Sequence, residues 1–259
     1  MEGLPDSKWE DSLRKSITEM ISETRYRHNL PFVAVSDLAR QFYCEQKVDL
    51  SYVLGDIPTD SKLIGDAVHD QVLAMRATTK NKLISDIKSG KSVIASFLLF
   101  GQISGVNIAG MPDAVYFYEG KPKILIELKT TGGSISRLWE DQILQAQLYA
   151  YLMEQMGFDI SEMRIFIMKI KQDISEKEAL LELALFYIKL HKEKELEKVL
   201  PVKMFEVKYD KDFVMSKSSW ALDYWLLKRE PVPAKIASKC RSCEYSKQCK
   251  FSLTEKNSS

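Results

Sequence analysis

The pattern of apolar positions changes period along the chain. Ile64, Val68, Val72 and Met75 recur at helical spacing, so residues 62–78 are predicted to form a helix with one buried face. From residue 92 the apolar runs become short and rich in β-branched and aromatic residues, which predicts strands. These runs lie at 92–100, 103–110, 113–118 and 123–129. A Gly-Gln turn is expected between the first two, and Gly132-Gly133 ends the run of strands.

The second half of the chain alternates long amphipathic segments with short apolar ones. The pattern predicts two helices, at 135–156 and 176–200, and two strands, at 164–170 and 203–209. Asp210 is expected to cap a last helix, which the prolines after residue 230 stop. The buried face of that helix is predicted to hold Phe213, Trp220, Tyr224 and Leu227.

This order of elements predicts an α/β fold, with a mixed central β-sheet flanked by helices on both faces. Near the N-terminus, Ser36 is expected to cap a short helix that delivers Cys44. We divide the chain into a helical N-terminal extension at 1–34, a core at 35–230 that includes the Cys44 helix, and a C-terminal cysteine loop and tail at 231–259.

Composition is that of an ordinary globular protein. Of 259 residues, 45% are hydrophobic and 28% are charged, and the formal net charge is +1. No run approaches the ~20 apolar residues of a membrane span, and the mixed, acidic N-terminus does not read as a secretory signal. We therefore expect a cytoplasmic protein without a membrane partner. A net charge near zero neither requires nor excludes nucleic acid, because basic groups can gather on one face.

The segment GMPDAVYFYEGKPKILIELKTT carries candidate chemistry. Asp113 opens one predicted strand and Glu127 closes the next, so a turn between them brings both carboxylates to the same end of a hairpin. The period of two places Glu127 and Lys129 on one face and Leu128 in the core. Two carboxylates suit Mg²⁺ or Mn²⁺, which can acidify a water, and the lysine adds positive charge near a phosphate. An acid and a base on an ordinary strand is the simpler interpretation of Glu-x-Lys alone.

Gly110-x-Pro112-Asp113 followed by Glu127-x-Lys129 resembles the PD-(D/E)XK nucleases. Two further motifs resemble their RecB-type subgroup, namely Gln145-x-x-x-Tyr149 after the second strand and Gly65-x-x-x-His69 before the sheet. Gln147 and Tyr151 have the same spacing as the first of these motifs. The alignment with the family could therefore be shifted by two residues. A single histidine on a helix is more often structural, and only the motif favours a ligand here.

The resemblance implies a restriction-endonuclease-like core and a set of site residues. Gln145 and Tyr149 would orient the catalytic Lys129 and contact DNA. The implied metal ligands are His69, Asp113, Glu127 and the backbone carbonyl of Leu128.

The four cysteines are unevenly distributed. Cys44 stands alone, whereas Cys240, Cys243 and Cys249 lie within ten residues as C-x₂-C-x₅-C. Disulfides are uncommon in intracellular proteins, and four thiolates can hold a [4Fe–4S] cluster or a tetrahedral Zn²⁺. Either group would tie the Cys44 helix to the C-terminus. A set of unrelated buried cysteines is the remaining alternative.

Together these features resemble the CRISPR-associated RecB-type exonuclease family, the fourth Cas protein, over residues 36–250. The residue after the first cysteine, often proline there, is Glu45 here. The resemblance implies a [4Fe–4S] cluster on the four cysteines, Mg²⁺ or Mn²⁺, and degradation of single-stranded DNA from an end, commonly 5′ to 3′. The implied partners are single-stranded DNA or DNA ends and the CRISPR integrase complex, beside which family members trim spacer precursors. A homo-oligomer is also compatible.

Three alternatives stay open: a non-CRISPR iron–sulphur repair nuclease, a catalytically silent DNA-binding subunit, and structural zinc in place of the cluster. The C-terminal loop is a candidate clamp for the DNA backbone, with Tyr245 stacking on a base, although a solvated tail explains it almost as well. Trp139 and Trp220 are expected in the core. The basic residues of that loop are Lys235, Lys239, Arg241, Lys247 and Lys250.

Overall fold

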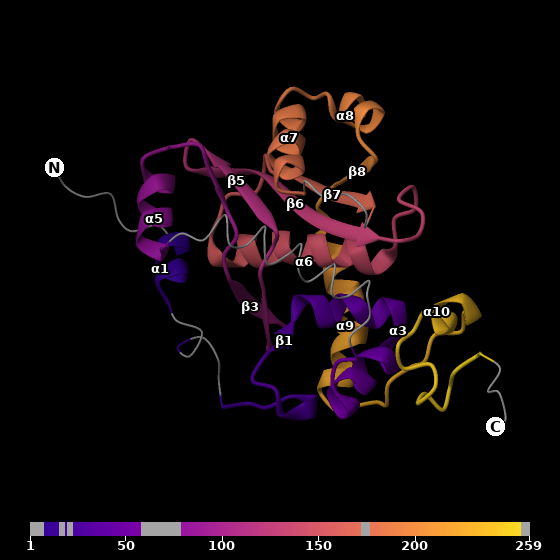
Figure 1. Ribbon diagram of the computed structural model, residues 1–259. Helices are drawn as coiled ribbons and strands as arrows, with labels where there is room; N and C mark the ends of the chain where they lie inside the picture. The colour runs from indigo at the N-terminus through magenta and orange to yellow at the C-terminus, as the bar shows by residue number, and fades with distance from the viewer. Residues whose placement is uncertain (1–7, 16–18, 20–22, 58–78, 172–176, 255–259) are drawn as a thin grey trace.

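A five-stranded mixed sheet forms the centre of the molecule (Figure 1). The computed structural model describes residues 8–15, 19, 23–57, 79–171 and 177–254. The sheet has the order β2-β5-β6-β7-β8, and only β6 and β7 run parallel. A parallel pair needs a crossover connection, and helix α6 (Glu140–Met156) supplies it. The strands are Val93–Ala95, Ala114–Tyr118, Lys121–Thr131, Arg164–Lys171 and Val202–Val207.

Helices cover both faces of this sheet, as the alternation of helices and strands predicts. Helix α6 (Glu140–Met156) lies on one face, while α7 (Lys177–Lys189) and α8 (Glu193–Val199) lie on the other (Figure 1). The two-residue period of the strands divides their side chains accordingly. Leu125 and Ile167 belong to the core on the α6 side, whereas Ile126 and Phe166 belong to the core on the α7 side.

A second, three-stranded sheet packs beside α6. Its order is β1-β4-β3, from Val33–Ala34, Val106–Gly110 and Leu99–Ile103. The predicted single strand at 92–100 is therefore wrong, because β2 and β3 belong to different sheets. The expected Gly-Gln turn is also wrong, since the β3–β4 turn lies at Ser104 and Gly105. Both turn residues have positive φ, 49° and 78°, as tight hairpin turns require, and Ser-Gly provides this at low cost.

Three predicted helices have different bounds in the structure. Helix α3 (Val35–Leu54) continues past Cys44, where the backbone is extended, and Ala34 rather than Ser36 precedes its first turn. The chain enters α3 directly from β1, so no side-chain cap is formed there. The single helix expected at 176–200 is broken between α7 and α8, where His191 has a φ of 55°. Helix α6 begins at Glu140 rather than near residue 135.

Helix α9 (Lys211–Trp225) has the predicted cap but not the predicted face. Asp210 accepts a hydrogen bond from the Phe213 amide at 2.9 Å. Trp220 is 41% exposed, because the helix carries apolar residues on more than one stripe. Leu227 is also exposed, and it lies beyond the end of the helix at Trp225. Spacing alone could not identify the stripe that meets the core, which contains Val214, Ala221, Leu222, Tyr224 and Trp225.

The remaining elements are short. They are α1 (Lys8–Arg14), η1 (Arg27–Asn29), α5 (Lys80–Lys88) and α10 (Ala237–Arg241). The helix predicted at 62–78 lies outside the described residues. None of the helices in the described part of the chain has the length and apolar character needed to cross a bilayer.

Candidate active site

The β5–β6 hairpin brings two carboxylates together. Ala114 pairs with Ile126 in the antiparallel ladder, so Asp113 and Glu127, one step further on, lie across from each other. Asp113 Oδ2 accepts a hydrogen bond from the Leu128 amide at 2.6 Å. Asp113 is 3% exposed and Glu127 is 1% exposed. Buried carboxylates need compensating partners, and the surroundings of this pair provide them.

Lys129 connects the hairpin to helix α6. Its Nζ lies 2.8 Å from Glu127 Oε1 and donates to Gln145 Oε1 at 2.7 Å. Burial by itself would lower the pKa of Lys129, but the carboxylates of Glu127 and Asp113 outweigh it and raise that pKa. The ammonium group therefore stays charged at neutral pH.

The Gln-x-x-x-Tyr spacing places one pair of side chains at the site and a second pair elsewhere. Gln145 Nε2 donates to the Tyr149 hydroxyl at 3.1 Å, and burial raises the pKa of Tyr149 well above its usual value. Gln147, in contrast, donates to the Lys208 carbonyl at 2.6 Å, and Tyr151 points its hydroxyl toward the Gln102 carbonyl. The first pair is thus the one that adjoins Lys129.

These side chains line an open cleft of about 600 Å³ between α3, α6 and the ends of β4 and β6. Arg40 and Asp141 also line it, and sequence reasoning missed both. Arg40 is held by an ion pair with the buried Asp37, whose other oxygen accepts from the Tyr52 hydroxyl at 2.5 Å. Burial raises the pKa of Asp141, and the nearby Lys129 opposes that rise. Only the packing of α3 and α6 determines that these two side chains face the cleft.

Gly110 allows three elements to meet behind the cleft. A Cβ atom at this position would lie 2.8 Å from the Val35 Cβ and 2.9 Å from the Tyr149 Cε1. Glycine is therefore required where the end of β4 passes between α3 and α6. This explains in physical terms the first residue of the Gly-x-Pro-Asp motif.

The four cysteines line one small cavity, together with apolar residues such as Leu50 and Phe251. Turns at Cys240–Cys243 and Tyr245–Cys249 bring the C-terminal three to it. Cys44 Sγ accepts a hydrogen bond from the Ala234 amide at 3.3 Å. Burial raises the pKa of the Cys243 thiol. The four thiols therefore border the same cavity, but the described residues do not arrange three of them as a group that could hold a metal ion.

Within the described ranges, no three His, Cys, Asp or Glu side chains are arranged to hold a metal ion. His69, the predicted imidazole ligand, lies outside the residues that the structure describes. The two carboxylates and the Leu128 carbonyl are therefore the predicted ligands whose positions are known. Their oxygen donors suit a hard divalent cation.

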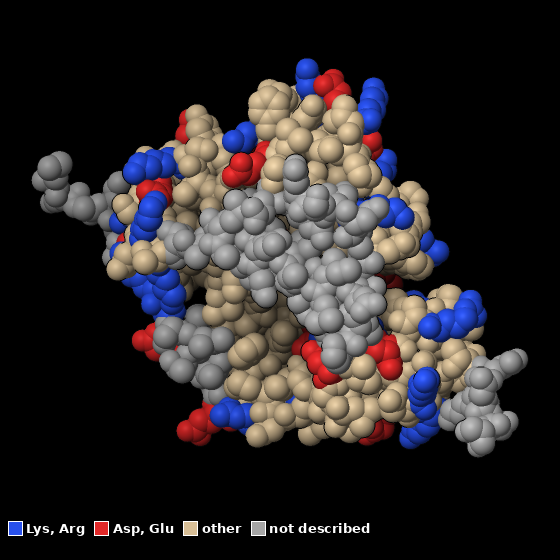
Figure 2. Space-filling model, in the orientation of Figure 1, with Lys and Arg blue, Asp and Glu red and all other residues tan. Residues whose placement is uncertain are grey.

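The predicted DNA contacts of the C-terminal loop need correction. Tyr245 is 0% exposed and its hydroxyl donates to the Gly55 carbonyl at 2.9 Å, so it cannot stack on a base. Lys239 Nζ donates to the carbonyls of Phe42 and Tyr43, which makes it part of the loop's attachment to α3. On the face drawn in Figure 2, outside the grey residues, Lys and Arg side chains are spread round the margin among acidic ones.

Carboxylate oxygens beside a charged lysine are groups that can bind a divalent cation and act on a phosphodiester. The chain belongs to the PD-(D/E)XK nuclease superfamily, whose family model matches residues 35–250. Members of this superfamily cleave nucleic acids with divalent metals. The core is accordingly restriction-endonuclease-like.

The crystal structure of SSO0001 is similar to this chain, with 17% sequence identity and a TM-score of 0.49. The similarity covers 95% of this chain and 96% of the other. At that identity and score, the likeness says nothing of what this chain binds or cleaves. None of the curated proteins matches the chain.

Proposed function

We propose that this protein is a DNA exonuclease that degrades single strands from an end, in the 5′ to 3′ direction. The supporting observation is the meeting of Asp113, Glu127 and Lys129 at one strand end, inside an open cleft. Gln145 accepts a hydrogen bond from Lys129 and donates one to the Tyr149 hydroxyl. Direction and strand preference rest on the resemblance to the CRISPR-associated RecB-type exonucleases.

The proposal gives a role to each residue of the catalytic motifs. Asp113, Glu127 and the Leu128 carbonyl, together with His69, would hold Mg²⁺ or Mn²⁺. The bound ion supplies charge neutralisation at the phosphate and lowers the pKa of a water. Lys129 stays protonated and would orient a water toward phosphorus, while Gln145 fixes the position of the ammonium group.

Arg40 is the candidate contact to the DNA backbone. Its guanidinium lies in the wall of the cleft, and its pairing with Asp37 holds it in place. An arginine fork matches the geometry of a phosphate, so Arg40 would bind the phosphate next to the scissile one.

We further propose that Cys44, Cys240, Cys243 and Cys249 hold a [4Fe–4S] cluster. The shared cavity of the four thiols supports this, and the cluster would tie α3 to the C-terminal loop. Anaerobically purified protein should be brown, with visible absorbance. If the protein is colourless and contains bound zinc, the four cysteines hold structural zinc and not an iron–sulphur cluster.

The biological setting follows only from the resemblance. In the CRISPR version, the enzyme trims spacer precursors beside the integrase complex, acting alone or as a homo-oligomer. An iron–sulphur repair nuclease would have the same active site. Genomic neighbours of the coding sequence distinguish the two settings.

The test is cleavage of end-labelled single and double strands with each metal. Asp113→Asn keeps an oxygen that accepts from the Leu128 amide but removes the charge. Glu127→Gln likewise removes the negative charge and keeps the size of the side chain. We expect both variants to lose activity by orders of magnitude with the fold intact. Asp159→Asn, a surface carboxylate paired with Lys121, is the matched control. Full activity in both site variants would refute the assignment, and DNA binding without turnover under any metal would favour a silent subunit.

A further inference from the structure

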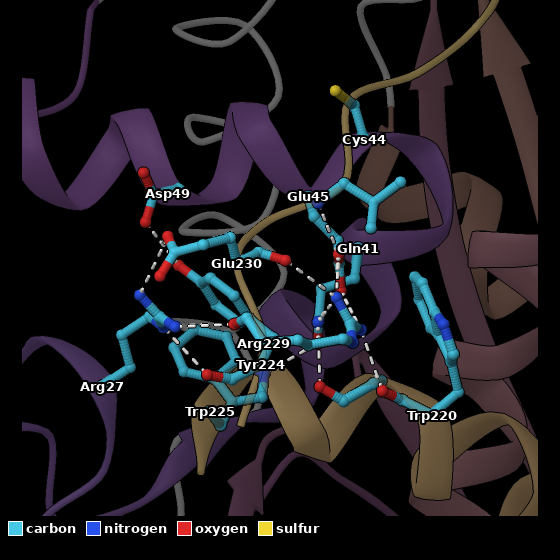
Figure 3. A network of polar contacts seen from close by, with 12 residues as sticks. Arg27, Gln41, Cys44, Glu45, Asp49, Trp220, Tyr224, Trp225, Arg229 and Glu230 are labelled. Carbon is cyan, nitrogen blue, oxygen red and sulfur yellow. Dashed lines mark hydrogen bonds and ion pairs between the residues drawn. The ribbon is translucent and has the colours of Figure 1, made fainter. Parts of the chain in front are cut away.

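Glu45, the residue next to Cys44, is a fully buried carboxylate in a dense polar network (Figure 3). Its Oε1 accepts from Gln41 Nε2 at 2.5 Å and from Arg229 Nη2 at 2.7 Å. Its Oε2 accepts from Arg229 Nη1 at 2.5 Å and from the Val232 amide at 2.8 Å. A two-point arginine–carboxylate pair of this kind is both strong and geometrically specific.

The donors to Glu45 are themselves held in place. Arg229 Nη2 also donates to the Trp220 carbonyl at 2.9 Å, and its guanidinium lies 4.1 Å from the centre of the Trp220 ring. Gln41 accepts from Trp225 Nε1 at 2.7 Å, which directs the amide nitrogen of Gln41 toward Glu45. Contacts with helix α9 thus hold both Arg229 and Gln41 in place, and these two side chains in turn hold Glu45.

The network also fixes the loop that faces Cys44. Glu45 accepts from the Val232 amide, and two residues further on the Ala234 amide donates to Cys44 Sγ at 3.3 Å. The side chains of two consecutive residues of α3 therefore accept hydrogen bonds from two amides of the same loop. This loop leads directly into α10 and the C-terminal cysteines.

We propose that the Glu45–Arg229 ion pair positions Cys44 within the cysteine site. By holding residues 232–234 against α3, the pair keeps the Ala234 N–H on the Cys44 sulfur. The inference rests on the proposed function of the four cysteines as ligands. Hydrogen bonds to ligand sulfurs help to set the reduction potential of a cluster, so loss of this contact should make the potential more negative.

The experiment compares anaerobically purified wild-type protein with Glu45→Gln, Arg229→Gln and Arg27→Gln. Arg27 belongs to the same network and donates to the Arg229 carbonyl at 2.8 Å, but it touches neither Glu45 nor Cys44. The readouts are the rate of cluster loss to a chelator, the reduction potential, and the melting temperature. We expect Glu45→Gln and Arg229→Gln to lose the cluster several-fold faster than the wild type. Their reduction potentials should also be more negative, while Arg27→Gln should lower only the melting temperature.

An unchanged potential and loss rate in folded Glu45→Gln would overturn the inference. Should Arg229→Gln fail to fold, Arg229→Lys keeps the charge but not the two-point contact, and is expected to show the same shift in milder form. If the wild-type protein holds no cluster, the cluster proposal fails separately. Alkylation of Cys44, with the other three cysteines changed to Ala, then tests the positioning: equal rates in Glu45→Gln and Arg27→Gln would refute it.

Discussion

Charge is unevenly balanced among the side chains of the active-site cleft. Arg40 and Lys129 are its two basic residues in the described part of the chain. Each has a carboxylate partner, Asp37 for Arg40 and Glu127 for Lys129. Such pairs stay ionised even when they are buried, because each charge stabilises the other. The acidic residues that line the cleft are Asp56, Asp113, Glu127 and Asp141, and a divalent cation would offset their excess.

At the residue scale, Gly110 offers a test of how packing supports the cleft. In Gly110→Ala the new methyl group would overlap Val35 and the Tyr149 ring, so one of them must move. We expect a loss of about 1–3 kcal/mol in the free energy of unfolding, as overpacked sites commonly show. Because Tyr149 contacts Gln145, DNA cleavage should also fall.

Gly133→Ala is the matched control for that substitution. The added methyl group there would only approach the Thr131 hydroxyl, at an ordinary 3.5 Å. Chemical denaturation and cleavage rates of the two variants provide the measurement. Equal behaviour of both variants would show that the close approach at Gly110 is not needed.

At the scale of elements, the parallel β6–β7 pair is what brings α6 to the site. The crossover must pass over one face of the sheet, so the N-terminal half of α6 lies beside the end of β6. This places Gln145 next to Lys129. On the opposite face, one carboxylate joins α8 to β8, because Glu197 accepts from the Met204 amide at 2.9 Å and from Lys203 at 2.7 Å.

Glu197 makes the stability of the α8–β8 unit depend on pH. Burial tends to raise the pKa of Glu197, but the hydrogen bonds from Lys203 and Met204 outweigh it, so the pKa is lowered in the folded state. The stabilisation is thus present above the ordinary value of 4.5 and is lost as pH falls through the folded pKa. At neutral pH, Glu197→Gln should cost about 1 kcal/mol of stability.

Urea unfolding at neutral pH and well below pH 4.5 measures this effect. The difference between wild type and Glu197→Gln should shrink toward zero in acid, where both side chains are neutral. Glu195→Gln changes a half-exposed carboxylate of the same helix and should have little effect at either pH. A difference that persists in acid would mean that packing, not charge, is responsible.

At the scale of the whole molecule, the sequence predicted what depends on neighbours along the chain. The carboxylate hairpin and the Gln-x-x-x-Tyr turn rely on strand period and helical spacing, both of which are local. Two of the errors occur where a distant segment decides. The strand at 92–100 divides between two sheets, and Trp220 turns outward, because of packing that spacing cannot reveal. The Glu45–Arg229 pair joins positions that are far apart in the chain and has no local signature.

His28 helps to attach residues 25–30 to the rest of the molecule, together with Arg27, which donates to the carbonyls of Tyr224 and Arg229. The His28 Nε2 lies 2.8 Å from the Tyr224 hydroxyl of α9, and the His28 ring stacks on Tyr52 of α3 at 4.6 Å between ring centres. Burial lowers the pKa of His28; the carboxylate of Asp49, 3.4 Å away, opposes this, while Arg27 adds to it. The histidine is therefore neutral in the folded protein at neutral pH.

The sign of this shift predicts that the N-terminal attachment weakens in acid. Because the folded pKa lies below the ordinary 6.5, protonation favours the detached state, and stability declines as pH falls below that value. Backbone amides of residues 25–30 should exchange with solvent faster below pH 6.5 than above it, after correction for intrinsic rates. His28→Asn tolerates the local φ of 60° and cannot titrate, so its exchange should lack this dependence. A wild-type His28 that titrates at or above 6.5 by NMR would contradict the prediction, because protonation would then strengthen the contact between the N-terminal segment, α3 and α9.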